Sequence, residues 1–210
     1  MSFLDEYILC NWRHSAGKTL DRLLEQECRP AKGIAEKREY HIVGVLEQER
    51  LTIQRVFGGS VIPCLPGDEI ERQRAQKAGE SQKPSADAYV MKGQGDMMDK
   101  STSLVLLECK YRVHTENVNA RAQKAKNLYY ELCNKFDSSR SFLEAEGRVC
   151  HKMEIVIFNA TAVDDMRDAI ESLCIGEGHP IFKVVDTAAL ARSGEGQAQV
   201  HHLRQGKAAR

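Results

Sequence analysis

PSADAYV at 84–90 and LVLLECKYR at 104–112 are the two segments that decide the fold. Both are apolar and β-prone, and the connector between them carries Gly and Asp, which predicts a hairpin with a longer loop. Side chains alternate between the faces of a strand, so Glu108 and Lys110 share one face, about 7 Å apart. Antiparallel pairing over 85–92 and 103–112 would bring Asp87 to the same side.

Two carboxylates and an amine that converge at a strand end can hold a hard divalent cation and a water molecule. Asp87 followed by Glu108-Cys109-Lys110 resembles the PD-(D/E)xK nuclease superfamily, which has the restriction-endonuclease-like fold. A bare Glu-x-Lys carries little information in a chain with 29% charged residues. The preceding Asp, the LVLL run before Glu108 and the order of helices and strands carry the resemblance, which covers the hairpin closely and its flanks loosely. The chain has Ser85 and Ala86 between Pro84 and Asp87, which weakens the signature more than the mechanism.

The resemblance implies an α/β fold, a restriction-endonuclease-like three-layer core in which helices flank a mixed central sheet. It implies a nuclease that hydrolyses phosphodiester bonds in nucleic acid, a DNA endonuclease being favoured over an enzyme acting on RNA. Asp87 and Glu108 would bind Mg²⁺ or Mn²⁺ together with the main-chain carbonyl of Cys109, and Asp21 would complete the site through water. Lys110 would orient or help to deprotonate the attacking water and offset negative charge in the transition state.

Two residues of a helix expected at 18–28 are candidates for a third acid in the site. Gly17-x-x-x-Asp21-x-Leu23-Leu24 resembles the first-helix motif of many nucleases in this superfamily, in which an acid points into the cleft. Asp21 also suits the first turn of a helix as a solvated acid, since the helix dipole favours negative charge there. Glu27, an acid within the apolar stripe of the same helix, is the second candidate.

A second helix is expected at about 115–136, with Thr115 as its N-cap and an apolar stripe along one side. Its basic residues include Arg121 and Lys124, which we expect to face the phosphates of a nucleic acid. The alternative is an ordinary solvent-facing side.

Periodicity predicts the remaining elements. Residues 66–83 have few apolar residues and many charges, which predicts a mobile loop or a short solvated helix. Within that segment Arg72, Arg74 and Lys77 are further candidates for phosphate contact, although solvation is the commoner reason for such a charge run. Residues 2–12 fit either a helix or a strand. Strands are expected at 39–46, 51–62, 153–161 and 181–186, and a helix at 162–174.

Length and composition predict a single domain over 1–190 and a disordered tail over 191–210. A hydrophobic content of 42% fits a globular protein, and no apolar run is long enough to span a membrane, so an intracellular protein without membrane contact is expected. The seven cysteines are irregularly spaced without a C-x-x-C pair, which favours reduced thiols over a disulfide framework or a zinc site.

Thirty basic and thirty acidic residues give a formal net charge of zero, unlike a protein that coats nucleic acid nonspecifically. Two alternatives to the nuclease hypothesis therefore stay open. One is a non-catalytic nucleic-acid-binding or assembly subunit that keeps the fold. The other is an α/β protein in which Asp87, Glu108 and Lys110 only form an ion pair at a sheet end. A homodimer is compatible with each of them.

Overall fold

The structure, a computed structural model, describes residues 1–12, 19–28, 47–55, 62–92, 96–111, 118–158, 169–170, 172–173 and 182–190. Short helices also cover 47–55 and 187–190. The named elements are α1 (Phe3–Tyr7), the π-helical turn η1 (Ile8–Trp12), α2 (Leu20–Glu27), β1 (Cys64–Pro66), α4 (Gly67–Ala78), β2 (Ala88–Met91), β3 (Ser103–Lys110), α5 (Val118–Ala145), β4 (Val149–Cys150), β5 (Glu154–Phe158) and β6 (Phe182–Asp186).

The strands form one mixed open sheet in the order β1-β2-β3-β5-β6, with the short β4 pairing to β3 ahead of β5. β1, β2 and β3 are antiparallel neighbours, whereas β3, β5 and β6 run parallel. The link from β3 to β5 includes the long helix α5, as a parallel connection requires a crossover. The expected α/β architecture with a mixed sheet flanked by helices is confirmed.

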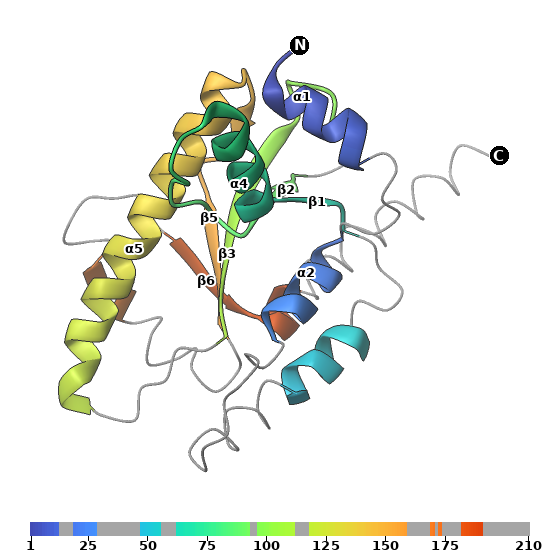
Figure 1. Cartoon of the computed structure of the whole chain (residues 1–210). Coiled ribbons are helices and arrows are strands. Elements are labelled where there is room, and N and C mark those ends of the chain that lie inside the picture. The colour runs from blue at the N-terminus through green and yellow to red at the C-terminus, as the bar shows by residue number, and fades with distance from the viewer. Residues whose placement is uncertain are drawn as a thin grey trace.

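Helices cover both faces of the sheet, because alternate strand residues feed two apolar clusters. Tyr89, Leu106 and Val156 belong to the cluster that includes α1, α4 and α5. Their strand neighbours, such as Leu107 and Ile157, belong to the cluster on the other face, which includes α2 and the helix at 47–55. Figure 1 shows α5 along one side of the sheet and α2 on the other. Glu108 and Lys110 alternate in step with Leu106, so they lie on the α5 face.

The predicted hairpin is confirmed. β2 and β3 pair antiparallel with Ala88 opposite Leu107 and Met91 opposite Leu104. The predicted strands at 153–161 and 181–186 correspond to β5 and β6, and β5 lies between β3 and β6 as its continuous apolar run indicates. Residues 3–12 are helical, which decides the ambiguity at 2–12.

The prediction of a loop at 66–83 is wrong over its first two thirds, where the chain forms α4. Ile70 and Ala75 are buried and attach the helix to the core. Gly79 ends the helix in the left-handed conformation, with φ of 67°, which glycine adopts without a steric penalty. The alternative prediction, a short solvated helix, fits these residues better, since charged pairs take the place of apolar contacts on the outer side of α4.

The prediction of a strand at 51–62 is also wrong for its first five residues, which belong to the helix at 47–55. Only Ile53 of those five is buried, so the apolar residues do not alternate across a sheet. The predicted strand at 39–46 and the tail at 191–210 lie outside the described residues. Of the helix at 162–174, the described positions 169–170 and 172–173 are helical.

Other expectations from composition have partial outcomes. No helix in the described ranges is long and apolar enough to cross a membrane. The described cysteines are free thiols. α5 extends to Ala145, nine residues beyond the predicted end at 136, whereas Thr115 lies outside the described residues.

Gly67 fixes the start of α4 against the segment that carries Asp87. Its N–H donates a hydrogen bond to the Asp87 carbonyl at 2.9 Å. A Cβ at this position would lie 1.9 Å from the carbonyl oxygen of Ala86. The two backbones therefore approach each other more closely than any side chain would allow.

We predict that Gly67→Ala lowers the free energy of unfolding by about 3 kcal/mol or more, because the clash is with backbone. Gly79→Ala is the matched control, since its Cβ would enter open space and the cost of about 1 kcal/mol is the left-handed backbone alone. Urea unfolding of both variants measures the difference. If both variants lose the same free energy of unfolding, the backbones of α4 and Ala86 can move apart at little cost.

A buried carboxylate connects α4 to the chain that leads into β2. Glu71 accepts hydrogen bonds from the Lys83 N–H at 2.8 Å and from the Arg74 guanidinium at 2.7 Å. Burial raises the pKa of Glu71, but these hydrogen bonds and the charge of Arg74 outweigh it and lower the pKa below the ordinary value of 4.5.

Because the folded-state pKa of Glu71 is lowered, its contribution to stability is present above pH 4.5 and is lost as the pH falls below that value. We expect Glu71→Gln to remove a contribution on the order of 1 kcal/mol at pH 7 and to flatten the acid side of the stability profile. Urea unfolding between pH 3 and 7 measures both. An unchanged acid slope would contradict the assignment.

Candidate functional site

Asp87 and Glu108 each accept a hydrogen bond from the main chain of the segment opposite. The register that pairs Ala88 with Leu107 continues to place Asp87 opposite Glu108. The Asp87 N–H donates to Glu108 Oε2 at 3.2 Å, and the Cys109 N–H donates to Asp87 Oδ2 at 2.7 Å. One oxygen of each carboxylate is thereby held by main chain, which leaves the other oxygen of each to face a cation.

That cation is the ammonium group of Lys135 from α5. Lys135 Nζ lies 2.5 Å from Glu108 Oε1 and 3.6 Å from Asp87 Oδ1. The side chains of Glu108 and Asp87 are 1% and 9% exposed, and that of Lys135 is 20% exposed. Two buried carboxylates, one just before β2 and one on β3, therefore both face this ammonium group.

Lys110 lies on the same side of the sheet as predicted. Its Nζ is 2.8 Å from Glu108 Oε1 and 2.7 Å from Glu131 Oε1. Burial lowers the pKa of Lys110, but the charge of Glu108 and the two hydrogen bonds outweigh it, so the pKa is raised. Lys110 is therefore an ammonium group at neutral pH.

One stripe of α5 supplies three of these contacts. Glu131, Lys135 and Ser139 are four residues apart, which places them one above another on the helix. Ser139 Oγ accepts a hydrogen bond from the Ala86 N–H at 2.8 Å. The same helix face thus contacts Lys110, the carboxylate pair and the residue before Asp87.

The surroundings of Asp87 make its ionisation less favourable than that of an ordinary aspartate. Burial and the neighbouring charge of Glu108 raise the pKa of Asp87 to about 7, against the opposing effects of Lys135 and the Cys109 N–H. The charge of Glu27 raises it further. Burial, followed by the charges of Asp87 and Glu27, also raises the pKa of the Cys109 thiol.

Of the two candidates for the third acid, Glu27 is among the main charges that raise the pKa of Asp87. Asp21 lies in the first turn of α2, six residues earlier, which places it about 120° away around the helix. The sequence hypothesis that named Asp21 first therefore has less support than the alternative that named Glu27.

The predicted substrate-binding residues lie on the N-terminal part of α5. The backbone of Arg121 is in this helix, and its side chain lies outside the described residues. Lys124 is exposed and precedes Glu131 by seven residues and Lys135 by eleven. These intervals place Lys124 on the same side of the helix as the site residues, about 10 Å beyond Glu131.

Comparison with family models, with curated proteins and with solved structures gives no match. We therefore infer the chemistry of the site from the positions of its side chains. Within the described ranges no group of three or more His, Cys, Asp or Glu side chains is arranged to hold a metal ion. Two hard carboxylate oxygens, Asp87 Oδ1 and Glu108 Oε1, do converge on a single cation. This donor pair fits Mg²⁺ or Mn²⁺, with water and main-chain carbonyl oxygen as further ligands.

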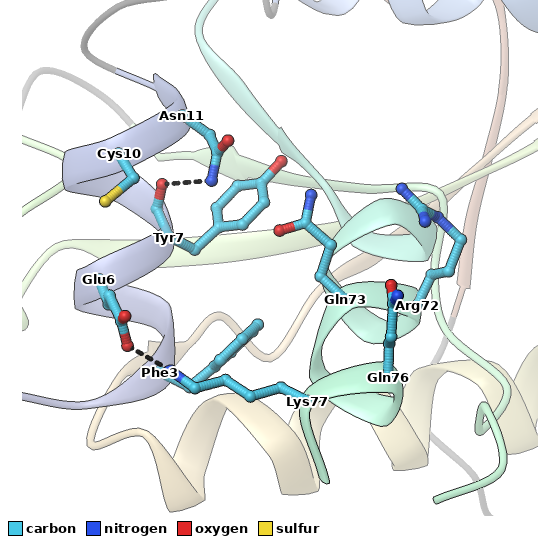
Figure 2. A pocket seen from close by; sticks show the side chains of 9 residues that line it. All are labelled: Phe3, Glu6, Tyr7, Cys10, Asn11, Arg72, Gln73, Gln76 and Lys77. Atoms are coloured by element: carbon cyan, nitrogen blue, oxygen red, sulfur yellow. Dashed lines mark hydrogen bonds and ion pairs between the residues drawn. The ribbon is translucent and has the colours of Figure 1, made fainter. Parts of the chain in front are cut away.

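A separate groove of about 430 Å³ lies between α1, η1 and α4. Figure 2 shows Tyr7 and Gln73 facing each other across it, with Glu6 bonded to Lys77 at 2.6 Å. Arg72 also lines this groove, whereas Arg74 pairs with Glu71 and Glu80. None of the residues around the carboxylate pair lines the groove.

Sequence reasoning did not name Lys135, Glu131 or Ser139 as site residues. The available signal was spacing: Lys124, Glu131 and Lys135 follow one another at intervals that keep one side of a helix. Because the helix was predicted to end at 136, nothing in the pattern placed the charges near that end at the site.

Proposed function

We propose that the chain is a metal-dependent nuclease of the PD-(D/E)xK type, which hydrolyses phosphodiester bonds in nucleic acid, with DNA the favoured substrate. The observation that carries the proposal is the convergence of Asp87 Oδ1 and Glu108 Oε1 on one cation, with Lys110 adjacent. Two acids and a lysine in that order on a hairpin match the motif seen in the sequence.

The topology supports the same proposal. With α4 and the short β4 left out, three antiparallel strands, a long helix and a parallel strand follow in the order β1-β2-β3-α5-β5. The restriction-endonuclease-like core has this order, with its acids on the second and third strands. Likeness of fold alone would not establish an activity, so the proposal depends on the carboxylate pair.

A bound Mg²⁺ or Mn²⁺ would supply Lewis-acid polarisation of the phosphate and an activated water. Asp87 and Glu108 would hold it through the two oxygens that face the cation position, and the Cys109 carbonyl stays a predicted third ligand. Lys110, charged at neutral pH, would orient the water and stabilise negative charge on the phosphoryl oxygens. Its raised pKa argues against a role as the general base.

The proposed reaction adds water to phosphorus while one P–O ester bond breaks. The oxygen of water joins phosphorus and one of its protons leaves. The departing ester oxygen takes a proton and becomes a hydroxyl group, so the two ends are a phosphate and an alcohol.

The second candidate is a non-catalytic nucleic-acid-binding or assembly subunit. The observation in its favour is that two lysines of the chain, Lys110 and Lys135, already neutralise the carboxylates. The simplest alternative, an ion pair at a sheet end, is also compatible with the 2.8 Å contact between Glu108 and Lys110. Cleavage and metal binding distinguish the three.

We predict that Lys110→Ala lowers the cleavage rate at least about a hundredfold with little change in metal affinity, because an ammonium group cannot ligate a cation. Asp87→Asn should instead weaken metal binding, since a charged oxygen ligand becomes a neutral one while an acceptor for the Cys109 N–H is kept. Plasmid and single-stranded RNA cleavage with Mg²⁺ or Mn²⁺, together with calorimetric metal titration, measures both effects.

Lys152→Ala is a suitable control, since Lys152 is exposed and lies outside this constellation. A parent protein that cuts neither substrate with either metal would favour the non-catalytic subunit. Cleavage by Lys110→Ala at the parent rate would remove Lys110 from the mechanism.

A further prediction concerns nucleic-acid binding. Replacing Arg121 and Lys124 together by Gln should weaken binding and reduce the slope of log affinity against log salt by about one to two units, because fewer counterions are displaced. Fluorescence anisotropy with a labelled duplex from 50 to 300 mM NaCl measures the slope. If the variant and the parent have the same slope, both charges face solvent and do not contact nucleic acid.

A further inference from the structure

Lys135 occupies the position at which the two carboxylates can hold a cation. Its ammonium group contacts Glu108 Oε1 at 2.5 Å and Asp87 Oδ1 at 3.6 Å, and these are the oxygens without a main-chain donor. A positively charged group at this position offsets the repulsion between two carboxylates that are both nearly buried.

The side chain of Lys135 can move while the helix that carries it stays in place. It lies between Leu132 and Phe136, which are buried and hold the helix backbone in place. Its own side chain is 20% exposed and carries the ammonium group on four flexible methylene groups. Asp68, at the start of α4, is a further carboxylate whose charge acts on Lys135.

We propose that Lys135 is an exchangeable counter-cation: its ammonium group holds Asp87 and Glu108 in the absence of a divalent cation and leaves them when one binds. The inference rests on the metal site of the proposed function. The ammonium group of Lys135 stands where the two oxygens converge, so it and a divalent cation compete for that position. Once displaced, the ammonium group stays within a side-chain length of the carboxylates, where it faces the phosphate of a bound nucleic acid.

The competition makes three features of the protein depend on one side chain. The metal-free site is preorganised, because the carboxylates are already oriented. Its affinity for a divalent cation is lower than that of the same carboxylates without Lys135. Its metal-free stability is higher, because the carboxylates are never left without a positive charge.

Calorimetric titration with Mn²⁺ and with Mg²⁺ tests the proposal on the parent, Lys135→Met and Lys135→Arg. Met keeps the length of the side chain without its charge, and Arg keeps the charge. We expect Lys135→Met to bind Mn²⁺ about tenfold to a hundredfold more tightly than the parent, and Lys135→Arg to resemble the parent. Lys126→Met is the matched control on an exposed position of α5 and should bind as the parent does.

Thermal unfolding gives an independent readout that needs no catalysis. Lys135→Met should unfold at a lower temperature than the parent without metal, and saturating Mn²⁺ should raise its midpoint by more than it raises that of the parent. If the variant is too unstable to purify, Lys135→Gln provides the same comparison with a polar side chain.

The outcomes separate this inference from the proposed function. Equal Mn²⁺ affinities of Lys135→Met and the parent would overturn the inference, and cleavage by that parent would leave the nuclease proposal standing. Tight binding by Lys135→Met with no binding by the parent would support the inference and overturn the nuclease proposal, since the native lysine would then keep the metal out. Absence of binding in every variant would overturn both.

Discussion

Two crossed hydrogen bonds, from the Asp87 N–H to Glu108 and from the Cys109 N–H to Asp87, are the constraint on which the rest of the site depends. The main chain of each strand donates to the carboxylate of the other, at a level where the ladder of β2 and β3 has ended. Buried N–H groups need acceptors, so both acids are part of the sheet as well as of the site. Their remaining oxygens are oriented as a consequence of the fold, with no loop to adjust them.

Two contacts from other elements fix this constraint in place. Gly67 allows the backbone of α4 to touch Ala86, and Ser139 of α5 accepts the Ala86 N–H. The residue next to Asp87 is therefore held from two sides. Since α5 also supplies Lys135, the position of the acid and the position of its counter-charge are set by one rigid helix.

The parts of the fold with a strong apolar period could be predicted from the sequence, and those stabilised by charge could not. β5 and the β2–β3 pairing follow from runs such as LVLL at 104–107, which only a covered strand accommodates. α4 was predicted only as the alternative to a loop, because polar contacts of Glu71 with Lys83 and Arg74 add to the few buried apolar residues of the helix. Asp87, Glu108 and Lys110 could be named because a hairpin brings them together locally.

Lys135 could not be named in the same way. It reaches the site from 27 residues beyond Glu108 in the chain, and a lysine on a helix usually faces solvent. The rotation of α5 about its axis decides that Glu131 and Lys135 face the strands that carry the acids. The rotation is set by buried residues on the helix, such as Leu132 and Phe136, which long-range packing controls.

Cys109 stands between Glu108 and Lys110 in sequence yet points to the opposite layer, where the residue is buried. Burial and the nearby carboxylates raise its pKa, so little thiolate forms at neutral pH. The residue therefore resists oxidants and alkylating reagents for as long as the layer that includes α2 covers this face of the sheet. Modification of the thiol would report the separation of that layer from the strand that carries Glu108 and Lys110.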